Sequence, residues 1–270
     1  MKIAISNIAW TAEEDEEVYA IMQEKGVKGL EVAPTRIWEK PYEQPQQIIE
    51  QYHKYINNKD IEIIAMQALL FGRPDLKIFD SREKRDETFE YLKKNIILGS
   101  QLGAKALIFG SPRNRIIGDM DRNKAMDIAV DFFSRLGDIA LQNNVKFCIE
   151  SNPEEYGTDF IYTTKQGLEL VKEVNNEGFK LNIDVGAMTI NGENYREIIE
   201  EVFPYIAHFH ISEPHLKHIS NTKTEHLNIA KILKKLNYKN WVSIEMKSGL
   251  DNRNTEAVEK TLDFIMCVYN

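Results

Sequence analysis

Short apolar runs alternate with longer amphipathic stretches along the whole chain. Most of the short runs are apolar at successive positions, which is typical of parallel strands covered by helices. Polar and turn-forming residues separate these runs from the stretches between them. The pattern predicts eight strands, at Lys2–Asn7, Leu30–Ala33, Ile61–Met66, Ala106–Gly110, Lys146–Glu150, Lys180–Asp184, Ile206–His210 and Val242–Met246.

The longer stretches repeat apolar residues at the spacing of an α-helix, and several are bounded by helix start and stop signals. Thr11 precedes the first stretch and Gly26 follows it, while Ser81 and Gly103 flank the third. Ser and Thr cap helix N-termini, and Gly tolerates the left-handed conformation that ends many helices. The predicted helices are Glu13–Lys25, Gln44–Asn57, Ser81–Leu102, Arg122–Asn143, Lys165–Val174, Asn194–Val202, Glu225–Leu236 and Thr255–Tyr269.

Loops on the two sides of the predicted strands differ in length. Connections that enter strands are short, whereas the longest irregular segments follow strands. In a (β/α)8 barrel the segments after the strands build the functional face. The long segments are Pro34–Glu43, Gln67–Asp80, Ser111–Asp121 and Ser212–Lys223.

Eight strand–helix pairs in 270 residues predict an α/β fold, a single-domain (β/α)8 TIM barrel spanning residues 1–270. No Pro-, Gly- or Ser-rich linker divides the chain. A doubly wound open sheet is the alternative fold. That fold usually carries a Gly-rich phosphate loop after its first strand, and the segment SNIAWTAEED has none.

Composition narrows the classes of function. The net charge of −8 argues against a general nucleic-acid surface, which needs clustered Lys and Arg. Two cysteines, Cys148 and Cys267, form no disulfide framework or zinc-finger pattern. The opening MKIAISNIAW is typical of a first strand, and no run of about 20 apolar residues indicates a membrane span. We therefore expect a cytoplasmic protein with neither a nucleic-acid nor a membrane partner.

Four polar residues stand at the ends of consecutive predicted strands: Glu150, Asp184, His210 and Glu245. Strand ends of one kind meet at the same rim of a barrel, so we expect these side chains to converge. Three carboxylates held together require a cation or shared protons. Oxygen ligands with one imidazole and no thiolate suit one divalent ion, Mn²⁺ first, with Mg²⁺, Co²⁺ or Zn²⁺ as alternatives.

Further polar residues at the same predicted rim are candidates for substrate contacts. Glu31 ends the second strand and could bind a sugar hydroxyl or form a rim ion pair with Arg36. Arg113 could bind an anionic group or remain a solvated loop charge. Lys247 follows Glu245 by two residues and should share its inward face. The candidate substrate-binding residues are Asn7, Glu31, Gln67, Arg113, Asn152 and Lys247.

Several segments resemble the xylose-isomerase-like barrel superfamily. They are IESNP at 149–153, NIDVGAM at 182–188, HFHISEP at 208–214 and VSIEMK at 242–247. The opening MKIAISNIAW and GLEVAPTRIW at 29–38 are similar to the sugar isomerase and epimerase branch of that group. The resemblance covers nearly the whole chain.

The resemblance implies that Glu150, Asp184, His210 and Glu245 bind one divalent cation and that the two glutamates also act as an acid/base pair. It implies proton transfer next to a carbonyl through a metal-stabilised enediolate, which is the chemistry of a sugar isomerase or epimerase. The substrate would be a small sugar or sugar derivative. Relatives often form dimers or tetramers, so a homo-oligomer stays open.

Departures from the family patterns keep alternatives open. Ketohexose 3-epimerases carry a His where this chain has Ala187, and an Arg where Lys217 is the nearest base. Endonuclease IV-type enzymes carry further histidines where this chain has Gln67 and Ser111. The alternatives are an inosose dehydratase-like lyase, an endonuclease IV-like abasic-site phosphodiesterase, and a barrel that has kept the site but lost turnover.

Overall fold

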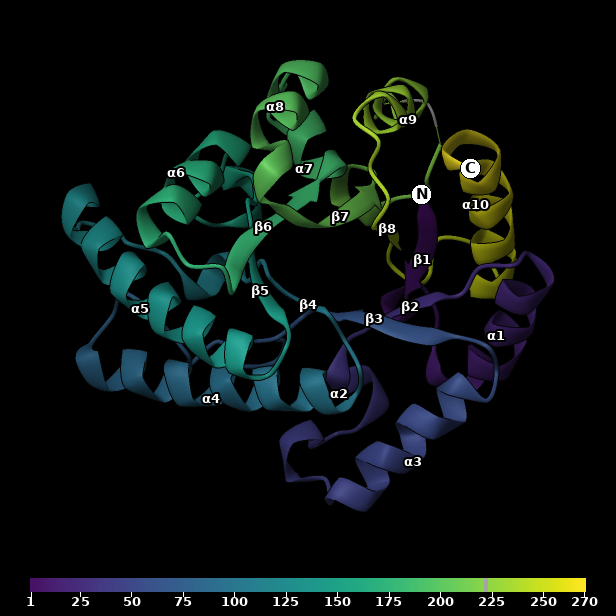
Figure 1. Ribbon diagram of the computed structural model, residues 1–270, viewed down its shortest axis with the longest axis horizontal. Helices are drawn as coiled ribbons and strands as arrows, with labels where there is room; N and C mark the ends of the chain where they lie inside the picture. The colour runs from purple at the N-terminus through teal and green to yellow at the C-terminus, as the bar shows by residue number, and fades with distance from the viewer. Residues whose placement is uncertain (221–222) are drawn as a thin grey trace.

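Eight parallel strands form a closed barrel in the order of the chain, and helices surround it (Figure 1). The computed structural model describes residues 1–220 and 223–270. The predicted single-domain TIM barrel is confirmed. The strands are β1 (Lys2–Ser6), β2 (Gly29–Val32), β3 (Glu62–Met66), β4 (Ala106–Phe109), β5 (Lys146–Glu150), β6 (Phe179–Asp184), β7 (Ile206–Ser212) and β8 (Trp241–Glu245).

The eight predicted helices are present, and their ends lie within two residues of the predicted ones. They are α1 (Asp15–Glu24), α3 (Gln46–Asn57), α4 (Arg82–Gln101), α5 (Arg122–Gln142), α6 (Thr164–Val174), α8 (Tyr195–Val202), α9 (His226–Lys235) and α10 (Asn254–Tyr269). The predicted caps explain the bounds of α4, whereas Thr11 caps the 3₁₀ turn Ala12–Glu14 and Glu14 is the N-cap of α1. The Ser81 hydroxyl accepts a hydrogen bond from the Lys84 amide, and Gly103 follows α4 with φ +89°.

The segments after the strands contain short helices that the periodicity did not predict. These are α2 (Pro34–Ile37), α7 (Val185–Ile190), and the 3₁₀ turns η1 (Asn7–Ala9), η2 (Ala12–Glu14), η3 (Pro41–Glu43), η4 (Pro112–Asn114), η5 (Glu154–Tyr156) and η7 (Pro214–Leu216). A further 3₁₀ turn, η6 (Phe203–Tyr205), lies between α8 and β7. Of the predicted loop Ser212–Lys223, residues 221–222 lie outside the described part of the chain. No helix among the described residues is long and apolar enough to cross a membrane.

Strand register sets the height of each side chain in the barrel. Asp184 lies beside His210, and Glu245 lies beside Ser212. The strand β7 therefore runs two residues past His210, and the prediction that His210 ends its strand is wrong. The pairing with β8 continues to Ser212, and an irregularity beside Leu181 shifts the register with β6.

The core has two parts. One large cluster of apolar side chains fills the space between the barrel and the helices, and a second, smaller cluster fills part of the barrel interior. The interior cluster consists of Ala4, Ile64, Ala65, Ala106, Ile108 and Cys148. Cys148 thus points inward, as strand alternation predicted from Glu150. The polar residues described below lie along the same inward-facing strand positions.

Candidate metal centre

The four predicted ligands come together at the carboxyl ends of β5 to β8. One candidate ligand atom from each of Glu150, Asp184, His210 and Glu245 lies within 4.8 Å of the others. His210 Nδ1 is 3.0 Å from Glu150 Oε1, 3.3 Å from Glu245 Oε2 and 3.9 Å from Asp184 Oδ2. The imidazole thus stands among three carboxylates.

Burial and charge act in opposite directions on this cluster. Burial raises the pKa of Asp184, and the neighbouring Glu150 and Glu245 carboxylates raise it further. Burial also opposes ionisation of Glu150, but its hydrogen bond with His210 holds the pKa of that carboxyl below its usual value. The cluster therefore favours added positive charge, which a divalent cation supplies.

The donor set fits a cation. Carboxylate oxygens with one imidazole nitrogen suit Mn²⁺, Mg²⁺, Co²⁺ or Zn²⁺. Cys148 lies in the barrel interior, where burial raises the pKa of its thiol to about 12. A thiol that stays protonated is a poor ligand for these ions.

Neighbouring polar groups fix the orientation of the carboxylates. Asn182 Nδ2 donates to Glu150 Oε1 at 2.7 Å. The Ser212 hydroxyl lies 2.8 Å from both oxygens of Asp184, and the Ala187 amide donates to Asp184 Oδ1 at 2.6 Å. Asp184 is also the N-cap of α7, whose free amides favour negative charge. Ala187 thus contributes its main chain where the 3-epimerase pattern has a histidine.

Arg115 holds the loop after β4 against Glu150. Arg115 is 1% exposed, and its guanidinium donates to the main-chain oxygen of Glu150 at 3.0 Å and to Asn152 Oδ1 at 2.9 Å. Asn152 Nδ2 in turn donates to Glu150 Oε2 at 3.0 Å. Gly110 allows the close packing, since a Cβ there would lie 2.6 Å from Glu150 Oε2.

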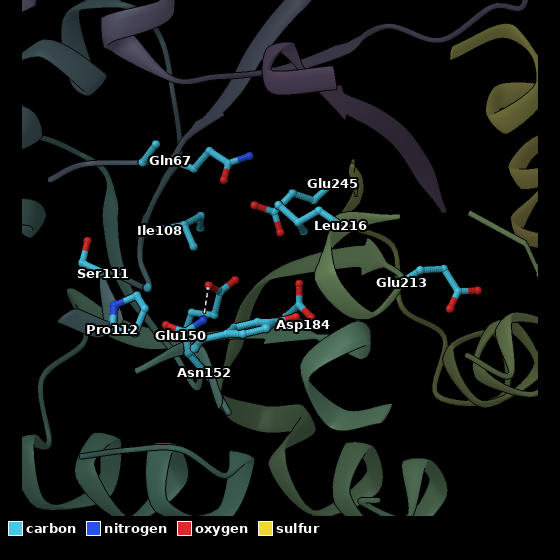
Figure 2. Close-up of a pocket in the computed structure, with 13 residues that line it drawn as sticks. Gln67, Ile108, Ser111, Pro112, Glu150, Asn152, Asp184, Glu213, Leu216 and Glu245 are labelled. Carbon is cyan, nitrogen blue, oxygen red and sulfur yellow. Dashed lines mark hydrogen bonds between the residues drawn. The ribbon is translucent and has the colours of Figure 1, made fainter. Parts of the chain in front are cut away.

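A cavity of about 250 Å³ opens above the carboxylates, and Figure 2 shows Glu150, Asp184 and Glu245 pointing toward it. This volume is suited to a small molecule. The cavity is lined by Gln67, Ala68, Ile108, Gly110, Ser111, Pro112, Glu150, Asn152, Tyr156, Asp184, Glu213, Leu216 and Glu245. Gln67 and Asn152 are thus the predicted substrate-binding residues that reach it.

The other four candidates lie elsewhere. Asn7 is 1% exposed, and its Oδ1 accepts a hydrogen bond from the Ala33 amide at 2.8 Å. Arg113 is exposed, and it is not among the described residues that line the cavity. Lys247 is also exposed, because β8 ends at Glu245 and the strand alternation does not continue beyond it.

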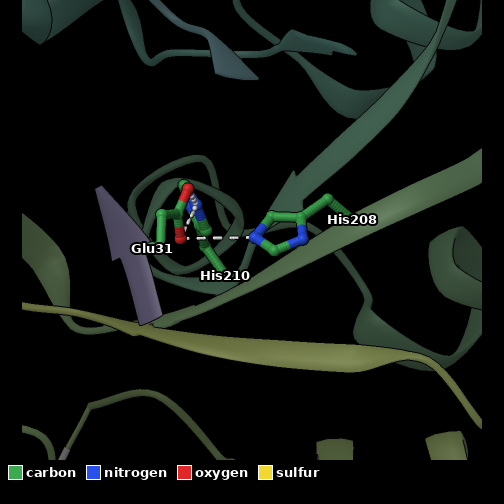
Figure 3. A group of neighbouring side chains, drawn as sticks. All are labelled: Glu31, His208 and His210. Atoms are coloured by element: carbon green, nitrogen blue, oxygen red, sulfur yellow. Dashed lines mark hydrogen bonds and ion pairs between the residues drawn. The ribbon is translucent and has the colours of Figure 1, made fainter. Parts of the chain in front are cut away.

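Glu31 is 0% exposed, and its carboxylate contacts two imidazoles, those of His208 and His210 (Figure 3). Burial opposes its ionisation, but the two imidazoles hold the pKa of Glu31 well below its usual range. The predicted rim ion pair with Arg36 is wrong, since Arg36 pairs with Asp15 at 2.7 Å. Glu31 does not line the cavity, so a direct substrate contact gains no support from its position.

Three cavity-lining residues had no signal in the sequence pattern: Tyr156, Glu213 and Leu216. Tyr156 stands in a 3₁₀ turn after β5, and its oxygen accepts a hydrogen bond from the His215 amide at 2.9 Å. Burial raises the pKa of Tyr156 to about 12, so its hydroxyl keeps its proton at neutral pH. His226 does not line the cavity; it is 0% exposed, and its Nδ1 lies 3.0 Å from the Tyr269 hydroxyl.

Comparison with known families and structures gives consistent results. A family model described as "Xylose isomerase-like TIM barrel" matches residues 19–266. None of the curated proteins searched matches the chain significantly.

Solved structures match over almost their whole length. A 3-keto-D-glucoside 4-epimerase from E. coli is 17% identical, with 99% of each chain covered and a TM-score of 0.82. A D-psicose 3-epimerase with D-tagatose, from Clostridium cellulolyticum H10, is 15% identical, with 100% of each chain covered and a TM-score of 0.82. An IOLI protein with a binding zinc atom is 17% identical, covering 100% of this chain and 98% of its own, with a TM-score of 0.78. At these identities the likeness shows the fold.

Proposed function

The chain belongs to the xylose isomerase-like TIM barrel family, and from this premise we propose that it is a metal-dependent isomerase or epimerase of a small sugar or sugar derivative. The observation that carries the proposal is the cluster of Glu150, Asp184, His210 and Glu245 at the floor of a small cavity. The sugar epimerases among the similar structures add support through their shared fold.

Glu150, Asp184, His210 and Glu245 would hold the cation, for which Mn²⁺ is our first expectation. When bound, the cation supplies positive charge that polarises a carbonyl and offsets the negative charge of an enediolate. The residues around the cluster keep the carboxylates in place for this task. Asn182 and Ser212 do so through their hydrogen bonds to Glu150 and Asp184.

Glu150 and Glu245 would act as the acid/base pair. Both line the cavity, and they stand on β5 and β8, three strands apart in the closed sheet. One carboxylate would remove the proton next to the carbonyl, and the other would return a proton. Return to the opposite face of the same carbon gives an epimer, and return to the neighbouring carbon gives an isomer.

Gln67 and Asn152 would hydrogen-bond sugar hydroxyls, since an amide both donates and accepts. Tyr156, which keeps its proton, is a further candidate donor. None of the other four candidates lines the cavity, namely Asn7, Glu31, Arg113 and Lys247. Their contacts with substrate therefore remain predictions without support from their positions.

The lining also bears on the charge of the substrate. Three carboxylates face the cavity, from Glu150, Asp184 and Glu245, and no Lys or Arg lines it among the described residues. Glu213 also borders the cavity, but its carboxylate points away and accepts hydrogen bonds from Thr224. A phosphate group would meet like charge there, so we favour an uncharged sugar. The same acidic lining gives no support to the phosphodiesterase alternative.

The test is turnover of a panel of ketoses and aldoses by the purified protein loaded with Mn²⁺. Replacing Glu150→Gln should lower turnover by about 100-fold or more, because an amide cannot transfer the proton. The matched control is Glu154→Gln, an exposed carboxylate four residues away that should keep full turnover. Full turnover by Glu150→Gln would remove Glu150 from the mechanism, and loss of water from the sugars would support the lyase.

A further inference from the structure

Glu31 is a fully buried carboxylate whose described partners are two histidines of another strand. It belongs to β2, whereas His208 and His210 belong to β7, with β8 and β1 between them in the closed sheet. Its side chain therefore reaches across the barrel interior (Figure 3). Burying a carboxylate is costly even when it is paired. The presence of Glu31 in the barrel interior therefore calls for a reason beyond packing.

The contacts of Glu31 are directed at one edge of the His210 ring. His210 Nε2 lies 3.0 Å from Glu31 Oε1 and 3.1 Å from Oε2. An ionised carboxylate only accepts hydrogen bonds, so Nε2 carries the proton and donates it. The other ring nitrogen, Nδ1, faces Glu150, Glu245 and Asp184.

His208 supports this arrangement from the other side of the carboxylate. Its Nε2 lies 3.3 Å from Glu31 Oε2, and the side chain is almost fully buried. The two imidazole rings stand nearly perpendicular, at 87°, with centroids 5.2 Å apart. Glu31 is thus held between two imidazole rings.

We propose that Glu31, supported by His208, is the positioning residue that keeps the proton of His210 on Nε2 and presents Nδ1 to the cation. The inference rests on the proposed metal centre. A ligand imidazole binds through a lone pair, and a carboxylate on its other nitrogen fixes both the tautomer and the ring orientation. Glu31 acts through His210 and touches neither cation nor substrate.

A second cation between Glu31, His208 and His210 is the competing explanation, because their ligand atoms also lie within 4.8 Å of one another. This explanation would require Nε2 of His210 to lose its proton while Nδ1 serves the first cation. The group also offers only one carboxylate, and none of the three buried side chains lines the cavity above the four proposed ligands. We therefore expect one cation per chain.

The test compares Zn²⁺ binding by the full chain and by Glu31→Gln, using calorimetry for affinity and stoichiometry. We expect one Zn²⁺ per chain and a loss of affinity of about 10- to 100-fold in the variant, as for other residues that orient metal ligands. The matched control is Glu193→Gln, a partly buried carboxylate that belongs to neither ligand cluster and accepts a hydrogen bond from the Thr164 amide. It should bind Zn²⁺ as the parent does.

Nitrogen-15 NMR of labelled histidines provides a readout that mere destabilisation would not move. We expect a downfield Nε2–H signal from His210 with and without Zn²⁺, lost or shifted in Glu31→Gln. His208→Asn, which leaves Glu31 and His210 intact, should give an intermediate loss of affinity and serves if Glu31→Gln does not fold.

Each outcome bears on a different claim. Unchanged affinity and an unchanged His210 signal in Glu31→Gln would overturn the inference while leaving the metal centre intact. Two Zn²⁺ per parent chain, falling to one in His208→Asn, would overturn it in favour of a second site. A parent protein that binds neither Zn²⁺ nor Mn²⁺ would overturn the proposed function, and the His210 signal would still show whether Glu31 orients the ring.

Discussion

Asp184 and Glu150 lie in the same cluster, yet their pKa values move in opposite directions. Burial and two neighbouring carboxylates raise the pKa of Asp184, whereas the His210 contact outweighs burial and lowers that of Glu150. The imidazole favours one carboxylate over the other because it lies 3.0 Å from Glu150 and 3.9 Å from Asp184. Within this cluster, Asp184 is therefore a carboxylate that tends to retain a proton.

This difference predicts the pH dependence of cation binding. Because the pKa of Asp184 is raised, the group stays protonated at a pH where an ordinary aspartate is ionised, and a cation must displace that proton. The affinity should fall as the pH is lowered, by about tenfold per pH unit for each displaced proton.

Calorimetry of Mn²⁺ binding from pH 8 to 5.5, in buffers of different ionisation enthalpy, measures both the affinity and the protons released. Ionised Asp184 destabilises the folded state above its unfolded pKa, so the rise in thermal midpoint on adding Mn²⁺ should also grow with pH. An affinity that is constant over this range would contradict the proposed ligand set.

At the scale of elements, the loop after β4 is fastened to the strand that carries Glu150. Arg115 donates to main-chain oxygens of Gly110 and Ile161 at 2.8 Å each, and to Phe160, as well as to Glu150 and Asn152. One buried guanidinium therefore joins the end of β4, the end of β5 and the segment that leads to α6. This side chain decides where Asn152 lies in the cavity.

Replacing Arg115→Met should lower the free energy of unfolding by about 3 kcal/mol or more, because several buried carbonyl oxygens would lose their donor. Arg113→Met is the matched control, since Arg113 is exposed in the same loop and should change stability by less than about 0.5 kcal/mol. Urea unfolding measures both. Equal effects in the two variants would show that Arg115 does not fasten the loop.

At the scale of the whole molecule, charge is distributed unevenly between the two ends of the barrel. Three carboxylates face the cavity at the carboxyl ends of the strands, as described above. A cavity at the opposite end has a volume of about 500 Å³ and is lined by five lysines and one glutamate, namely Lys2, Lys105, Lys146, Lys180, Lys239 and Glu177. The net charge of −8 conceals this separation.

The acidic lining of the cavity predicts that the protein discriminates against phosphorylated substrates. A sugar that the protein turns over should bind at least about tenfold more tightly than its phosphate ester, because the ester would bring like charge into the acidic cavity. Competition of the two compounds for turnover measures the difference. Equal or tighter inhibition by the ester would contradict the preference for an uncharged sugar.

The sequence by itself determined the architecture of the barrel. The signals are local: hydrophobic runs of strand length, helical spacing between them, and capping residues such as Ser81 and Gly103. They depend on neighbouring residues in the chain and not on tertiary contacts. Four polar residues at consecutive predicted strand ends were also visible, because parallel strands in a barrel present their ends at one rim. These signals were enough to predict that Glu150, Asp184, His210 and Glu245 converge.

Only the tertiary structure decided which of the other polar residues reach the cavity. Arg113 and Arg115 are equivalent in the sequence, but loop geometry buries one and exposes the other. The sequence pattern places Glu31 at the rim of the barrel, at the end of the second predicted strand, yet its side chain crosses the interior to His208 and His210. Register, closure of the sheet and loop packing are long-range properties, and they place side chains in ways that a local pattern of hydrophobic and polar residues does not encode.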